Sequence, residues 1–174
     1  LESMGQHERQ PWFGCACCPG NITRFMASVS NYQYATQGDD IYVNLYIQGT
    51  ASISTNHNEV QLIQSTDYPW AGVIKFSLSP RHGQTFALRL RIPGWAENSP
   101  VPGNLYSFVD KQQIYTIKVN GQPVKANVIG GYAVIERRWA KGDCVELSLP
   151  MDVRRVRAND NVQDDRGKLA LERG

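Results

Sequence analysis

Residues 85–92 read Thr-Phe-Ala-Leu-Arg-Leu-Arg-Ile, and this stretch decides the fold class. From Phe86 onward, large apolar side chains occupy every second position, with Ala87, Arg89 and Arg91 between them. Successive residues of a β-strand face opposite sides of the sheet, so this period of two predicts a strand with one buried face.

Outward from this stretch, similar short runs predict strands at 41–47, 51–55, 59–64, 73–79, 114–119, 124–128, 131–137, 144–149 and 153–157. Asn120-Gly121 is typical of a hairpin turn, and a Pro/Gly-rich insertion fills 93–105. About nine or more short strands at a spacing of roughly 8–12 residues favour two packed antiparallel sheets. We therefore predict an all-β fold, an antiparallel, jelly-roll-like β-sandwich.

One helix is predicted before the strands, over residues 22–35, with Asn21 as its N-cap. Its apolar residues recur at steps of three and four, which is the spacing of one helix face; they are Ile22, Phe25, Met26, Val29 and Tyr32.

Composition excludes several classes of protein. The chain has 174 residues, of which 41% are hydrophobic and 20% charged, typical of a folded domain rather than a disordered one. A net charge of +2 gives no basis for binding nucleic acid or an anionic membrane. No apolar run approaches the ~20 residues of a membrane-spanning helix. The start at Leu1 without an initiator Met suggests a segment of a longer protein.

Three of the four cysteines lie in one short patch, Cys15-Ala16-Cys17-Cys18-Pro19. Clustered thiols indicate a soft metal, with Zn²⁺ the first candidate. They would lie just before the helix, where the helix dipole favours thiolate over thiol. A structural zinc knuckle and incidental buried thiols are the alternatives, because the patch contains no clear fourth ligand. His7 and Glu8 are nearby, but their spacing matches no familiar metal site.

Outside the patch, Cys144 is interpreted as a small apolar residue of the core. Tryptophans of a sandwich can stack on sugars, but Trp95 and Trp139 are interpreted as core-capping corners, and Trp70 is also expected to be buried. Solvated positions are expected for four arginines, Arg89, Arg91, Arg154 and Arg155.

The stretch Pro11-Trp12-Phe13-Gly14-Cys15-Ala16-Cys17-Cys18-Pro19-Gly20-Asn21 resembles glycoside hydrolase family 127, the bacterial β-L-arabinofuranosidases. The resemblance continues downstream at Ile92-Pro93-Gly94-Trp95, Val119-Asn120-Gly121, Trp139, Gly142-Asp143 and residues 167–174. It implies an (α/α)₆ barrel followed by β-sandwich domains. Residues 1–36 would be the last loop and helix of the barrel, 40–150 a β-sandwich, and 151–174 the start of a further, truncated sandwich.

The chemistry that the resemblance implies is hydrolysis of a terminal β-L-arabinofuranoside with retention of configuration. By motif position, Cys17 would be the nucleophile, Cys17 and Cys18 would bind Zn²⁺, and Cys15 is a third candidate ligand. The acid/base glutamate and the other zinc ligands would lie outside this chain, so we expect the fragment alone to be inactive. No motif assigns the acid/base role to Glu8.

Two other functions remain open for the sandwich: binding of carbohydrate, and a structural brace that mediates contacts in a homodimer. The expected partner of the enzyme is an oligosaccharide or glycan that contains L-arabinose. Localisation stays open between the bacterial cytoplasm and periplasm.

Overall fold

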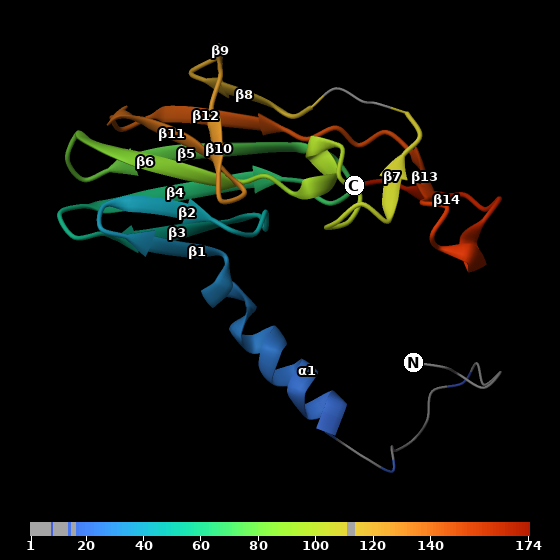
Figure 1. Ribbon diagram of the computed structural model, residues 1–174. Coiled ribbons are helices and arrows are strands. Elements are labelled where there is room, and N and C mark those ends of the chain that lie inside the picture. Colours follow the sequence, from blue (N-terminus) through green and yellow to red (C-terminus); the bar gives the residue numbers. More distant parts are fainter. Residues whose placement is uncertain (1–7, 9–13, 15–16, 111–113) are drawn as a thin grey trace. The chain divides into compact units, whose positions relative to one another are not determined.

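The computed structural model of the protein describes residues 8, 14, 17–110 and 114–174. The chain divides into two compact units, residues 1–32 and 33–174. In the first unit, helix α1 spans Cys17–Ser28 and is followed by a 3-10 turn, η1, at Val29–Tyr32 (Figure 1). The prediction of a helix over 22–35 was therefore wrong at both ends, since residue 34 already begins a strand.

The second unit contains two packed sheets (Figure 1). Sheet A has the order β1-β2-β6-β11-β10, with bounds Tyr34–Gln37, Asp40–Val43, Gln84–Arg91, Tyr132–Trp139 and Asn127–Ile129. Sheet B has the order β3-β4-β5-β12-β8-β9, with bounds Gly49–Ser54, Glu59–Thr66, Val73–Pro80, Asp143–Ser148, Thr116–Val119 and Gln122–Val124. In the described part of the chain, β2 and β6 run parallel and the other paired strands run antiparallel. The predicted antiparallel β-sandwich is confirmed.

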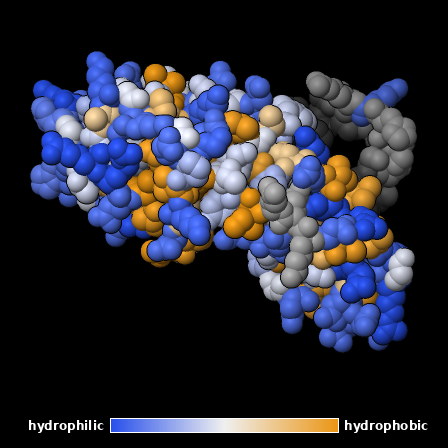
Figure 2. All heavy atoms as spheres, turned by 90° about the horizontal axis from the view of Figure 1, so that it is seen from above, coloured by the Kyte–Doolittle hydropathy of each residue, from blue (hydrophilic) through white to orange (hydrophobic). Residues whose placement is uncertain are grey.

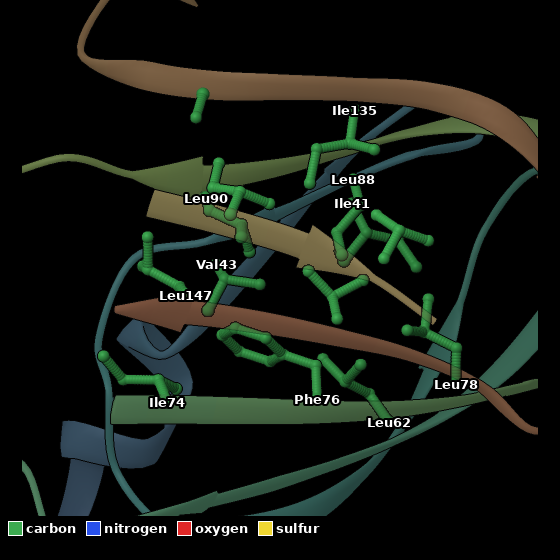
Figure 3. Packing of buried hydrophobic residues seen from close by; sticks show 14 of the residues in the cluster. Ile41, Val43, Leu62, Ile74, Phe76, Leu78, Leu88, Leu90, Ile135 and Leu147 are labelled. Atoms are coloured by element: carbon green, nitrogen blue, oxygen red, sulfur yellow. The ribbon is translucent and has the colours of Figure 1, made fainter. Parts of the chain in front are cut away.

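The core lies between sheets A and B (Figure 3). On β6, Leu88 and Leu90 are fully buried, while Arg91 at the strand's end is exposed. The register places Leu88 opposite Ile135 and Leu90 opposite Ala133 on β11. The alternation of residues 85–92 thus fixes which face of the central strand enters the core.

The predicted strand at 41–47 ends at Val43, because the chain then crosses from sheet A to sheet B. Between Val43, where β2 ends, and Gly49, where β3 begins, the backbone carbonyls need donors other than a sheet neighbour. The side-chain amide of Gln64, which is fully buried, donates to the carbonyls of Leu45 and Ile47 at 3.2 and 2.8 Å. Gln33 donates to the carbonyl of Ile47 as well, at 2.7 Å.

A small sheet C adjoins the two others, in the order β14-β13-β7, with bounds Ala170–Glu172, Arg154–Ala158 and Tyr106–Phe108. Arg154 was expected to be solvated, and this was wrong: it is only 4% exposed. Its guanidinium lies 3.4 Å from the ring centroid of Phe108 and donates at 2.7 Å to the carbonyl oxygen of Trp95. The buried charge is accommodated because it has a carbonyl acceptor and an aromatic face.

The surface of the sandwich is largely hydrophilic, with separate hydrophobic patches (Figure 2). This agrees with the alternation of the strands, whose outward positions are mostly polar. Among the described residues, no helix has the length and apolar character needed to cross a membrane.

Candidate functional site

Cys17 and Cys18 lie in the first turn of α1. The expectation that these thiols lie in a loop before the helix was therefore wrong. Asn21 is also not the N-cap, because it sits inside the helix and its Oδ1 accepts a bond from Arg24 at 3.4 Å. The early start is possible because Pro19 falls in the first turn, where a backbone N–H has no helical acceptor to reach.

The two thiols are close enough to share one metal ion. Their Sγ atoms are 3.8 Å apart, and both residues are exposed. A tetrahedral zinc site with Zn–S bonds of about 2.3 Å places two sulfurs about 3.8 Å apart. The donor type and spacing therefore fit half of a zinc site, at the helix end where the dipole favours anionic groups.

The described residues do not supply the other half. No group of three or more His, Cys, Asp or Glu side chains gathers for a metal within residues 17–110 and 114–174 or at the isolated positions 8 and 14. Cys15 and His7 lie outside the described residues, and Glu8 is exposed. Further ligands would have to come from elsewhere.

The apolar stripe of α1 is exposed, with Ile22, Phe25 and Met26 each more than half accessible. Phe25 in α1 and Tyr32 in η1, seven residues apart, place their ring centroids 6.1 Å from each other, so these two side chains lie on one face.

Cys144 was expected in the core, and this was wrong: it is exposed on β12. The sequence contained the signal, because apolar Val145 and Leu147 alternate with Cys144 and Glu146, which places Cys144 on the same face as a charged residue. The structure buries Val145 and Leu147, so Cys144 lies on the opposite face of the strand. Its Sγ lies 3.9 Å from the hydroxyl of Ser77 on the neighbouring strand.

The three tryptophans in the described part of the chain differ in burial. Trp139 is fully buried, and its indole N–H donates to the carbonyl of Phe86 at 3.0 Å, as expected of a core residue. Trp95 is half-buried against the core. Trp70 was expected to be buried and is instead 79% exposed.

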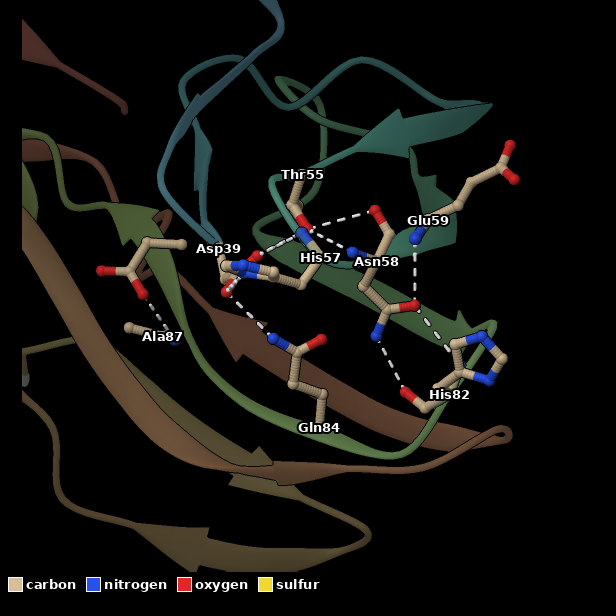
Figure 4. Close-up of polar contacts among 9 residues, drawn as sticks. Asp39, Thr55, His57, Asn58, Glu59, His82, Gln84 and Ala87 are labelled. Atoms are coloured by element: carbon tan, nitrogen blue, oxygen red, sulfur yellow. Dashed lines mark hydrogen bonds and ion pairs between the residues drawn. The ribbon is translucent and has the colours of Figure 1, made fainter.

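A polar cluster that the sequence analysis did not find joins three turns at one end of the sandwich (Figure 4). Asp39 accepts hydrogen bonds from the Thr55 hydroxyl at 3.0 Å and the Gln84 amide at 2.9 Å, and Nδ1 of His57 lies 2.8 Å from its Oδ2. The hydrogen bond with His57 is the main reason that the pKa of Asp39 falls below its usual value. These contacts occupy the carboxylate, which indicates a brace between turns rather than a catalytic group.

The sandwich has a recognisable family. Residues 40–151 match the family model described as the beta-L-arabinofuranosidase, GH127 middle domain. The chain belongs to the GH127 family. A curated relative from Bifidobacterium longum, named non-reducing end beta-L-arabinofuranosidase, is 34% identical over 173 residues, which is 95% of this chain and 23% of that protein.

Solved structures agree with this membership and extend beyond the middle domain. A GH127 beta-arabinofuranosidase is 45% identical with a TM-score of 0.88, covering 97% of this chain and 27% of its own. A GH127 beta-L-arabinofuranosidase from Geobacillus stearothermophilus T6 is 37% identical with a TM-score of 0.79, covering 95% of this chain and 24% of its own. The chain thus spans about a quarter of the length of these relatives.

Proposed function

We propose that the intact protein carrying this sequence is a retaining glycosidase that releases terminal β-L-arabinofuranose from an oligosaccharide or glycan. Two facts support this: the membership of GH127, and the relatives named as β-L-arabinofuranosidases at 34–37% identity. The observation that carries the chemical assignment is the pair of exposed thiols, 3.8 Å apart, in the first turn of α1.

In this proposal the Cys17 thiolate is the nucleophile. Its Sγ attacks the anomeric carbon, the C–S bond forms as the glycosidic C–O bond breaks, and the leaving oxygen takes a proton from an acid outside the described residues. The conjugate base of that acid then takes a proton from water as the water oxygen attacks the same carbon, the C–S bond breaks, and its electron pair returns to Cys17. Two inversions at one carbon leave the configuration retained.

Cys17 and Cys18 would hold a zinc ion, with further ligands from outside the described residues. When bound, zinc would keep the thiols deprotonated near neutral pH and lower their basicity. Lower basicity matters for Cys17 because a sulfur that attacks carbon must also leave it. Cys18 would contribute by binding the zinc ion and thereby fixing the orientation of the neighbouring Cys17 thiolate.

The test is replacement of Cys17 by Ser in the intact protein, assayed with an aryl β-L-arabinofuranoside. We expect kcat/KM to fall on the order of 10³-fold or more, since a nucleophile acts as part of a unit. Cys144→Ser is the matched control, because Cys144 is an exposed thiol on β12, and turnover should be unchanged.

A second measurement separates the metal from the nucleophile. Cys18→Ser should lower the zinc content of the purified protein, measured by atomic emission. Unchanged turnover in Cys17→Ser would remove Cys17 from the nucleophile's role, and an unchanged zinc content in Cys18→Ser would exclude Cys18 as a ligand.

A further inference from the structure

A hollow of about 460 Å³ opens at the end of the sandwich where β6 finishes, between residues 44–46, Tyr68 and the turn 93–102. Its volume falls in the range of small-molecule sites, roughly 300–1,000 Å³. The hollow lies wholly within the unit formed by residues 33–174 and shares no residue with the cysteine pair.

Aromatic and proline rings form part of the walls of the hollow. Tyr68 and Trp95 pack on the core with part of their surface and line the hollow, together with Pro93 and Pro100. Tyr46, which is only 7% exposed, also lines the hollow, and its hydroxyl donates to the carbonyl of Arg91. Flat rings of this kind suit the C–H faces of a sugar ring.

The lining carries one charge among its described residues, the guanidinium of Arg91. Within the described residues, no carboxylate forms an ion pair with Arg91. Burial raises the pKa of the Tyr68 phenol, and the positive charge of Arg91, which lines the same hollow, partly opposes that rise. An exposed guanidinium in a concave site, with no ion-pair partner among the described residues, is suited to binding a carboxylate in two-point fashion.

The hollow is held in shape before any ligand arrives. The short turn η2, Gly94–Glu97, carries Trp95, and the N–H of Ser99 closes it on the carbonyl of Gly94 at 2.9 Å. The buried Arg154 donates to the carbonyl of Trp95 and, at 3.4 Å, to Oδ1 of Asn98. A preorganised site loses less entropy on binding than a flexible loop would.

We propose that this hollow binds a sugar residue bearing a carboxylate, such as a hexuronate, with Arg91 on the carboxylate and Trp95 and Tyr68 against the ring. The carboxylate follows from Arg91, whereas the choice of a sugar over other small carboxylates rests on the proposed glycosidase function.

The test is ligand-observed NMR on the intact protein with two probes of nearly equal shape, methyl β-D-glucuronide and methyl β-D-glucoside. The first differs from the second by a carboxylate in place of a hydroxymethyl group. We expect the glucuronide to bind at least ~10-fold more tightly, since hydrogen bonds between charged groups are stronger than those between neutral groups.

Two variants locate the binding. Arg91→Gln should weaken glucuronide binding about tenfold or more, whereas Arg81→Gln, a change at an exposed arginine in the turn between β5 and β6, should leave it unchanged. Equal binding of the two probes, or equal affinity in both variants, would overturn the proposal. If acetate binds with the same affinity as the glucuronide, the proposed contribution of the sugar ring is wrong. If the glucuronide does not bind, this hollow is not a uronate site.

These outcomes are independent of turnover. A protein that lacks arabinofuranosidase activity but binds glucuronide through Arg91 would contradict the proposed function and leave the carboxylate site standing. An active arabinofuranosidase that does not bind the glucuronide would support the proposed function and contradict the carboxylate site.

Discussion

Replacing Gly72 by Ala should destabilise the sandwich strongly, because the added Cβ has no room. Gly72 precedes β5, and a Cβ built there overlaps the carbonyl oxygen of Leu149 and lies 2.8 Å from Cγ of Met151. The carbonyl belongs to backbone just after β12, so it cannot move as a side-chain tip could. The N–H of Leu149 also donates to the carbonyl of Gly72 at 2.8 Å, which ties the two segments together.

The magnitude follows from three contributions. Overpacking costs about 1–3 kcal/mol, and loss of the Leu149–Gly72 hydrogen bond adds about 0.5–1.5 kcal/mol. The smaller entropy of an unfolded chain with Ala in place of Gly returns about 0.4–1 kcal/mol. The middle of each range gives a net loss of about 2 kcal/mol, equivalent to a fall in Tm of about 4–8 °C for a chain of this size.

Urea denaturation followed by tryptophan fluorescence measures this loss as a shift in midpoint. Gly49→Ala is the matched control, because Gly49 begins β3, has no atom within 4 Å of its built Cβ, and has no positive φ. That variant should be neutral or more stable by up to about 1 kcal/mol. A Gly72→Ala midpoint equal to that of wild type, or a Gly49→Ala variant that loses as much, would refute the reasoning.

Two further predictions concern the interior and the turns. Trp139→Phe should destabilise the chain by about 2 kcal/mol in the same assay. The change removes the indole N–H that donates to the carbonyl of Phe86, and it leaves a cavity at a fully buried position. An unchanged midpoint would contradict this expectation. The stability contributed by Asp39 should be present at neutral pH and decline as the pH falls below 3.8, because its folded pKa is lowered, chiefly by its hydrogen bond with His57. Asp39→Asn should therefore be less stable at pH 7 and show a shallower acid loss than wild type, and parallel pH profiles for the two proteins would exclude this role.

The crossing from sheet A to sheet B shows a limit of sequence reasoning. The run 41–47 has the composition of one continuous strand, yet pairing stops at Val43 and the carbonyls of Leu45 and Ile47 are satisfied by the distant Gln64. Local propensity records a preference for extended backbone, which both segments adopt. It does not record which neighbour receives the hydrogen bonds.

Candidate site residues show the same division. The Cys17–Cys18 pair can be recognised from sequence, because adjacent thiols are unusual and their motif resembles a family. Their place inside the first helical turn, and the 3.8 Å between their sulfurs, come from the structure. Arg91 and Arg154 look equivalent in sequence, yet one is exposed in a hollow and the other is buried against Phe108.

The period of two in residues 85–92, repeated in neighbouring runs, was enough to determine the antiparallel sandwich and which faces of its strands are buried. This works because alternation is a local property of an extended chain, and burial of one face is the largest favourable free energy available to it. Only the tertiary structure decided the order of the strands, the burial of Arg154 and the hollow beside Arg91. Each of these depends on contacts between segments far apart in the chain, and no local pattern encodes the partner.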